Sequence, residues 1–188
     1  MSAASEFEAV FLPVAALAYG TAVHLTRDRT EAEDLVQDAA LLAFRAFASF
    51  QPGTNFKAWF FRILTNAFYG RRRKAKHERN NLAIEDLPPL YLYGRVVEIG
   101  LEGEDPAAAL MDRFDSQQVS EALDALPEEY RVVATLYFMQ DFSYQQIADI
   151  VGCPVGTVRS RLHRGRRMLQ KSLWRVAGEY GILVGDHN

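Results

Sequence analysis

Apolar residues in the first 77 positions recur at intervals of three and four, the period of helices that pack along one side. Thr30 followed by Glu33 predicts a capping box at the start of one such helix. The apolar positions that follow it are Ala32, Leu35, Val36, Ala39, Ala43 and Phe47. Gln51-Pro52-Gly53 predicts a turn, after which the helical pattern resumes from Phe56 to about Lys76. We expect residues 7–77 to form a bundle of three or four helices.

The pattern changes between residues 78 and 115, where prolines and glycines interrupt every candidate helix and acidic residues dominate. A few apolar residues occur here, among them Leu90, Tyr91, Leu92, Val96, Val97 and Ile99. The composition favours a linker rather than a third folded unit.

Helical periodicity returns from about Ser116. Pro127 is expected in the first turn of a helix, ahead of two glutamates. Ser143 with Gln146 predicts a second capping box, at the start of a short helix. The turn Gly152-Cys153-Pro154 then leads into a basic helix from Val155 to about Trp174. A short helix, a tight turn and a longer basic helix together are typical of a helix-turn-helix unit.

These patterns predict an all-α fold of two small helical domains, a bundle and a helix-turn-helix domain, joined by a linker. The expected boundaries are 1–77 for the bundle, 78–115 for the linker, 116–175 for the helix-turn-helix domain and 176–188 for a tail. The single cysteine, Cys153, excludes an intramolecular disulfide and a cysteine-rich metal site, and it fits a reducing compartment. The apolar stretch from Ala9 to Tyr19 contains Pro13 and lacks the basic flank of a signal peptide, so we expect a soluble, cytoplasmic protein with no membrane insertion.

The net charge of −3 conceals an uneven distribution. Residues 1–77 carry +3, residues 78–115 carry −6, and residues 116–188 are neutral overall. Five basic residues lie between Arg71 and Lys76, and seven lie between Arg159 and Arg175 with no acidic residue among them. Two basic patches separated by an acidic segment indicate two contact surfaces on two bodies.

The basic helix has two distinct faces. Val158, Leu162 and Leu169 line one face, where Gly165 allows a close approach to a neighbouring helix. The opposite face carries donors suited to base edges and phosphates, namely Arg159, Ser160, His163, Arg164 and Arg167. The alternative, a solvated basic helix, is disfavoured by the capped helix and turn that precede it.

Two further surfaces occur in the first domain. The helix from Thr30 has a second face with one large apolar residue, Leu41, beside Asp34, Gln37, Asp38 and Arg45. That face is either a protein contact or an ordinary solvated surface. The aromatic residues Phe56, Trp59, Phe60, Phe61 and Phe68 precede the basic run at Arg71. Aromatic rings beside cations suit single-stranded nucleic acid, although most of these rings are needed for the core.

Residues 31–66 and 126–169, in this order around a linker, resemble the extracytoplasmic-function (ECF) class of bacterial sigma factors. The stretches that carry the resemblance are EAEDLVQDAALLAFRAFASF with FKAWFFRILTN, and LPEEYRVVATLYFMQDFSYQQIADIVGCPVGTVRSRLHRGRRML. It implies that residues 1–77 are the second conserved sigma region and residues 116–175 the fourth. The runs GTNFKAW and SRLHRGRR look most like a subgroup that answers oxidative stress.

The resemblance also implies roles for individual residues. Asp34, Gln37, Asp38 and Leu41 match positions that contact the clamp helices of the largest polymerase subunit. Phe50, Ile63 and Asn66 match positions that hold a flipped base of the downstream (minus-ten) element. Arg159, Ser160, His163, Arg164 and Arg167 would contact the upstream (minus-thirty-five) element.

The expected partners are core RNA polymerase, with the flap of its second-largest subunit as a further contact, promoter DNA, and an anti-sigma factor that is zinc-binding in the resembling subgroup. Two other classes of protein share parts of this pattern. A stand-alone helix-turn-helix regulator leaves the aromatic and basic bundle without a role. An enzyme with Asp34 and Asp38 as metal ligands lacks supporting histidines, so we expect no catalysis, no metal and no cofactor.

Overall fold

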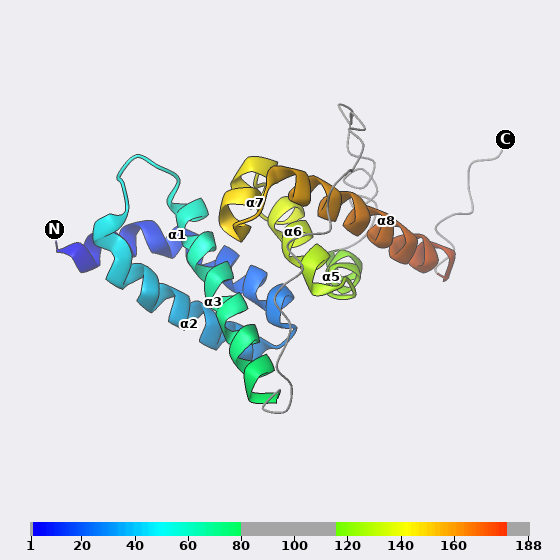
Figure 1. The fold of residues 1–188 in the computed structure, drawn as a ribbon, viewed down its shortest axis with the longest axis horizontal. Helices are drawn as coiled ribbons and strands as arrows, with labels where there is room; N and C mark the ends of the chain where they lie inside the picture. Colours follow the sequence, from blue (N-terminus) through cyan, green and yellow to red (C-terminus); the bar gives the residue numbers. More distant parts are fainter. Residues whose placement is uncertain (1, 80–115, 180–188) are drawn as a thin grey trace.

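The computed structural model describes residues 2–79 and 116–179, and every regular element in these two ranges is helical (Figure 1). This confirms the all-α expectation. The helices are α1 (Ala3–Thr26), α2 (Arg29–Ala46), the short 3₁₀ helix η1 (Phe47–Ser49), α3 (Phe56–Arg79), α5 (Ser116–Asp124), α6 (Glu128–Phe138), α7 (Tyr144–Val151) and α8 (Val155–Glu179). The predicted linker lies outside the described residues except for its first two positions, which extend α3.

Helix α1 has 24 residues and extends beyond the apolar stretch from Ala9 to Tyr19 at both ends. By length and composition alone it is long and apolar enough to cross a membrane. One face of it is nevertheless packed inside the protein, where Val14, Ala18, Ala22 and Leu25 are buried. That face makes α1 the central packing element for α2, α3 and α6.

The start of α2 differs from the sequence prediction. The capping residue is Asp28, whose carboxylate accepts a hydrogen bond of 2.8 Å from the backbone N–H of Glu31. Thr30 lies inside the first turn, so the predicted Thr30–Glu33 capping box is wrong. The cap falls at Asp28 because its backbone is extended, with φ −142° and ψ 129°, whereas Arg29 and Thr30 are already helical.

Helices α1, α2, η1 and α3 form what we call the N-terminal bundle. The predicted apolar face of α2 is confirmed, since Ala32, Leu35, Ala39 and Ala43 are all fully buried. Their counterparts on α3 are aromatic, as expected from a small bundle that needs large side chains to fill its centre. Phe56, Phe60, Phe61 and Phe68 are buried, and only Trp59 of the aromatic block is partly exposed.

Helices α5 to α8 form the C-terminal bundle, and its helix-turn-helix unit is confirmed. Ser143 and Gln146 form the predicted capping box at α7, and Gly152 ends that helix in the left-handed region with φ 72°. Pro127 is the N-cap of α6, one position before the predicted first turn. Helix α8 passes its expected end near Trp174 and runs to Glu179, and its Leu169 and Leu173 are buried in a cluster with residues of α5.

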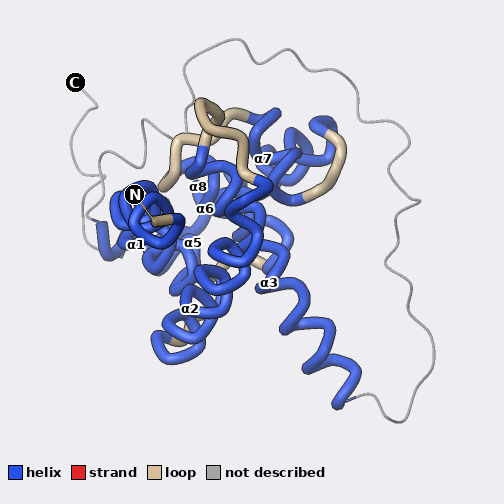
Figure 2. The backbone as a smooth tube through the Cα atoms, turned by 90° about the vertical axis from the view of Figure 1, so that its left-hand side faces the viewer, coloured by secondary structure: helices blue, strands red, loops and turns tan. Residues whose placement is uncertain are grey.

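The two bundles pack against each other, which the sequence analysis did not predict. One continuous core cluster contains Phe61 and Leu25 from the N-terminal bundle together with Phe142 and Ile147 from the C-terminal bundle. Helix α3 packs on α7, and α1 packs on α6. Figure 2 shows that the last turns of α3 project away from the other helices, which leaves residues 72–77 exposed.

Candidate nucleic-acid and polymerase interfaces

The outer face of α8 presents the residues that the sequence analysis assigned to the upstream element. Arg159, His163, Arg164 and Arg167 are exposed. Ser160 is partly buried, and its hydroxyl donates a 3.0 Å hydrogen bond to the backbone oxygen of Thr157. The opposite face is docked as predicted, because Val158, Leu162 and Leu169 are at most 1% exposed.

Gly165 lies on the docked face, and a Cβ built there would stand 3.5 Å from Cβ of Tyr130 on α6. This is the close approach that the sequence predicted for Gly165. Such packing fixes the rotation of α8 about its own axis and so determines which side chains point to solvent.

Two arginines of the basic run turn toward the protein instead. The guanidinium of Arg166 lies 5.0 Å from the ring centre of Tyr137 and donates to the Tyr144 hydroxyl at 3.1 Å. Arg161 lines a groove between α8 and the N-terminal bundle. A count of the basic residues in this run therefore overestimates the basic surface of α8. The positions of Arg161 and Arg166 in the helical period distinguish them from the exposed arginines of the same helix.

On α2, the four residues predicted to contact polymerase are exposed together. Leu41 is 57% exposed, and Asp34, Gln37 and Asp38 share its side of the helix. The carboxylate of Asp38 accepts a hydrogen bond from the guanidinium of Arg71, on α3. Sequence spacing gave no sign of this ion pair, because 33 residues separate the partners.

The apolar part of this surface is larger than the sequence suggested. Leu42 and Phe44 are 47% and 45% exposed, beside the single residue Leu41 that had been expected. Both lie within four residues of Leu41, so their exposure could have been inferred from the positions of the buried alanines on α2.

The three residues assigned to the downstream element take different places. Phe50 is partly buried among aromatic rings, with ring centres 5.3 Å from both Phe56 and Trp59. Ile63 is partly buried against the core. Asn66, one turn after Ile63, is exposed and has no hydrogen-bond partner in the part of the chain that the structure describes. The structure thus brings Ile63 and Asn66 to one side of α3, and it joins Phe50 to that side through Trp59.

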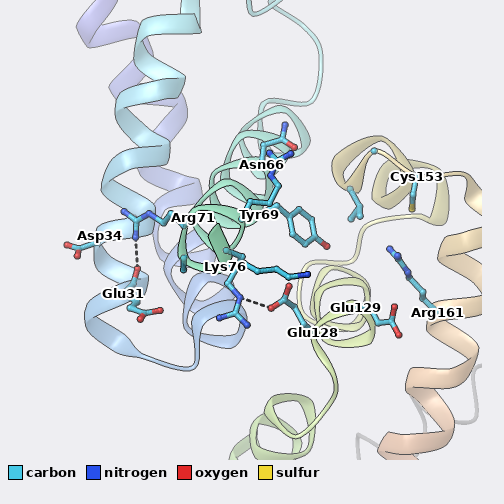
Figure 3. Close-up of a pocket in the computed structure, with 15 residues that line it drawn as sticks. Glu31, Asp34, Asn66, Tyr69, Arg71, Lys76, Glu128, Glu129, Cys153 and Arg161 are labelled. Atoms are coloured by element: carbon cyan, nitrogen blue, oxygen red, sulfur yellow. Dashed lines mark hydrogen bonds and ion pairs between the residues drawn. The ribbon is translucent and has the colours of Figure 1, made fainter. Parts of the chain in front are cut away.

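Asn66 opens onto a groove of about 1190 Å³ between the two bundles (Figure 3). One wall carries Asn66, Tyr69 and the basic run of α3, and the facing wall carries Cys153 and Arg161. Phe50 and Ile63 do not line this groove. Glu31, Asp34, Glu128 and Glu129 also line it, so the groove carries both signs of charge.

Burial in the groove raises the pKa values of two groups that line it. It raises the pKa of Tyr69 to about 12. Burial also raises the pKa of the Cys153 thiol, against a smaller opposing effect of Arg161. Because the thiolate is the reactive form, Cys153 is a poor nucleophile in this setting. Within residues 2–79 and 116–179, no three His, Cys, Asp or Glu side chains gather in a way that could hold a metal ion.

Comparison with known families identifies both halves of the chain. Residues 11–78 match sigma-70 region 2, and residues 116–169 match sigma-70 region 4. The ECF RNA polymerase sigma factor SigE of Mycolicibacterium smegmatis is 34% identical over 161 residues, which cover 86% of this chain and 59% of that protein. The chain thus spans about three-fifths of the length of this relative. SigW of Bacillus subtilis is 34% identical over 144 residues, covering 76% of this chain and 75% of SigW.

Solved structures agree with this assignment. The sigma factor RpoE of Bartonella quintana, crystallised with the anti-sigma factor NepR, has a TM-score of 0.67 and 32% identity, covering 89% of this chain and 96% of RpoE. CnrH, solved with the cytosolic domain of CnrY, shares the fold with a TM-score of 0.56 and 23% identity, covering 89% of this chain and 86% of CnrH. With two matching sigma regions in the expected order and relatives aligned over most of its length, the chain belongs to the ECF sigma factors.

Proposed function

We propose that this chain is a transcription initiation factor that binds core RNA polymerase, recognises promoter DNA at two separate elements and assists strand opening. The observation that carries the proposal is the presence on one chain of two different surfaces whose side chains suit nucleic acid. One is the exposed cationic face of α8, and the other is the exposed amide of Asn66 beside aromatic and basic side chains of α3. A protein that reads a single duplex site needs only the first.

For the upstream element, the proposed readers are Arg159, Ser160, His163, Arg164 and Arg167. A helix docked by its apolar face presents such side chains to the major groove, where arginine pairs with guanine through two hydrogen bonds. Each good pair of this kind favours the correct base over a wrong one by about 1–3 kcal/mol. The exposure of the four charged or aromatic members of this set supports the role.

For the downstream element, the proposed site is Asn66 with Ile63 and Phe50. The Asn amide both donates and accepts, so it can pair with the edge of one unstacked base. Trp59, Arg62, Tyr69 and Arg73 follow at spacings of three and four around Asn66, which puts two aromatic rings and two cations on the same side of α3. That combination suits a single strand, whose bases stack on rings while cations follow the phosphates.

For polymerase, the proposed contact is the exposed surface of α2 around Asp34, Gln37, Asp38 and Leu41, expected to meet the clamp helices of the largest subunit. The C-terminal bundle is expected to meet the flap of the second-largest subunit. The 57% exposure of Leu41 supports a protein contact, because a large apolar side chain beside carboxylates is typical of an interface. The catalytic chemistry of RNA synthesis belongs to the polymerase, and the proposed role gives this chain no reaction of its own. Its place of action is then the cytoplasm.

An anti-sigma factor completes the proposed set of partners. The similar sigma factor RpoE of Bartonella quintana was crystallised with such a partner, the anti-sigma factor NepR. Zinc binding by that partner and a response to oxidative stress remain predictions from the sequence resemblance.

Run-off transcription with purified core polymerase on genomic fragments tests the proposal. We expect discrete transcripts only when the chain and the core enzyme are both present. The competing function is that of a helix-turn-helix regulator without polymerase. It predicts tight, sequence-specific binding of the free chain to duplex DNA at physiological salt, with no transcript.

A further inference from the structure

The outer face of α1 is apolar, and the proposed function gives it no role. No Asp, Glu, Lys or Arg occurs between Glu8 and Arg27, although a surface helix normally carries charged side chains on its outer side. Leu12 is 61% exposed and Leu17 is 40% exposed. Figure 2 shows α1 along one edge of the molecule, with the other labelled helices to one side of it. The face that points away from them is open to a partner.

Four residues follow one another along this face. Ala9, Leu12, Ala16 and Gly20 recur at three- and four-residue spacing, so they lie on one side of the helix. The first three are exposed and Gly20 is partly exposed. We call these four residues the outer stripe of α1. Its centre is Ala16, and Leu12 is the most exposed large apolar residue that the structure describes.

Gly20 has no packing partner within the chain that would require a glycine. A Cβ built on Gly20 would have no heavy atom of another element within 4 Å. Glycine inside a helix is nevertheless less stable than alanine by about 1 kcal/mol. Because glycine is favoured where another backbone or side chain approaches closely, its place in the outer stripe indicates a neighbour from outside the chain.

A second copy of this chain fits the outer stripe. Two α1 helices that pack antiparallel about a two-fold axis at Ala16 place position 12 of each copy opposite position 20 of the other, since both positions lie four residues from the axis. Leu12 then packs over Gly20 of the other copy, where no side chain excludes it. The contact is made twice, because each copy supplies both a leucine and a glycine.

The charges at the two ends of α1 favour this orientation. Glu6 and Glu8 are exposed near its start, and Arg29 is exposed just beyond its end. An antiparallel pair brings each acidic end toward Arg29 of the other copy, whereas a parallel pair brings the carboxylates of both copies together. The helix dipoles also favour the antiparallel pair. The acidic end disfavours a membrane surface as the partner, because helices that lie on membranes carry Lys and Arg beside their apolar face.

The size of the face limits the strength of the contact. From Ala9 to Val23 the helix is about 22 Å long and about 10 Å wide. Stable complexes bury about 800 Å² of accessible surface on each partner, and a single helix face of these dimensions buries less. The pair is therefore weak and dissociates when the protein is dilute.

We propose that the outer stripe of α1 is a surface for weak homodimerisation, in which two antiparallel helices cross at Ala16 and Leu12 packs over Gly20 of the other copy. The proposal does not rest on the proposed function. It concerns a face of α1 that neither the DNA contacts of α3 and α8 nor the polymerase contact of α2 uses.

Sedimentation equilibrium of the full chain tests dimerisation. The average mass should rise from 21.2 kDa toward twice that value as the protein concentration is raised. Leu12→Glu should weaken association about tenfold or more, because both leucine contacts of the dimer are lost. Leu41→Glu is the matched control, since Leu41 is 57% exposed on a different helix, and association should be unchanged.

Three results of this experiment overturn the proposal. One is a mass of 21.2 kDa at every concentration. Another is an equal effect of Leu12→Glu and Leu41→Glu on association. The third is a chain that stays monomeric and binds phosphatidylcholine vesicles through Leu12, which would make the face a membrane contact.

Chemical cross-linking tests the position of the two-fold axis. In a Cys153→Ser background, Ala16→Cys places the two thiols beside the axis, within reach of a short bis-maleimide reagent. Ala9→Cys is the control on the same stripe, because its two copies lie about 21 Å apart along the antiparallel helices. We expect a covalent dimer from Ala16→Cys and little from Ala9→Cys. Efficient cross-linking of Ala9→Cys, as in a parallel pair, or none of Ala16→Cys, contradicts the antiparallel dimer.

Discussion

Asn66 is the residue whose environment bears most directly on strand opening. Its amide is exposed on α3, and no described residue forms a hydrogen bond with it. An amide used to support the bundle would be buried and paired, as buried amides generally are. Its exposure therefore favours a role in binding.

Replacing Asn66 with alanine should leave recruitment of the holoenzyme to the promoter intact and impair opening of the DNA strands. The holoenzyme should still form and bind the upstream element, because neither α2 nor α8 is touched. Strand opening should fail, since the unstacking of one base, which costs a few kcal/mol, is no longer offset. Abortive transcription on paired and on pre-mismatched templates measures this. The defect should shrink on the mismatched template, and an equal defect on both would place Asn66 in recruitment instead.

Arg159 and Lys171 are both exposed cations of α8. Replacing each in turn distinguishes the loss of a base contact from the loss of a positive charge. Arg159→Ala should relax discrimination at one upstream base pair by about 1–3 kcal/mol. Lys171→Ala removes the same charge farther along the helix and should weaken binding without changing sequence preference. A library of promoters varied across the upstream element, transcribed with each variant, measures both effects. If Arg159→Ala weakens all promoters equally, it contacts only phosphate.

At the scale of single helices, periodicity identified most of the structure because helix faces are local. The buried face of α2, the docked face of α8 and the capping box at Ser143 all follow from residues within a few positions of each other. The cap of α2 was misplaced because Asp28 and Thr30 are both good capping residues, and only the backbone conformation decides between them. Arg161 and Arg166 could be left out of the DNA-facing set from their helical positions alone, but the groups that they contact, such as the Tyr137 ring beside Arg166, could not be predicted.

The corrected cap gives a test of stability. Asp28→Ala should lower the free energy of unfolding by about 1 kcal/mol, because the backbone N–H of Glu31 loses its acceptor. Thr30→Ala should change it by a few tenths of a kcal/mol at most, because Thr30 is an exposed residue inside the first turn. Urea denaturation of the two variants compares them. A larger loss of unfolding free energy for Thr30→Ala than for Asp28→Ala would show that Thr30 caps the helix after all.

The surface of α2 gives a test of polymerase binding. Asp38→Arg should weaken holoenzyme assembly and slow association, because the reversed charge repels the basic groups expected on the clamp. The fold should survive, since the exposed ion pair of Asp38 with Arg71 contributes at most about 1 kcal/mol. Co-purification with core polymerase measures the effect, and Glu8→Arg, an exposed charge reversal on α1, serves as the control. If Asp38→Arg assembles with core polymerase as well as wild type does, this face of α2 is an ordinary solvated surface.

At the scale of the whole molecule, the contact between the two bundles could not be predicted from the sequence. His24 and Asp124 are 100 residues apart, and Lys57 and Gln140 are 83 apart. Nothing in the spacing of either pair links them, because long-range pairing is decided by the shape of both bundles together. The family motifs, by contrast, lie within single bundles, and this is why the function could be proposed from the sequence while the packing of the two bundles could not.

The central claim is that this chain enables core polymerase to open promoter DNA. Permanganate reactivity of thymines measures it most directly, because permanganate oxidises only unpaired thymines. On a promoter obtained from run-off mapping, we predict reactive thymines at the downstream element when the chain and core polymerase are both present, and none with either alone. Paired thymines throughout the downstream element in the complete mixture would contradict the account.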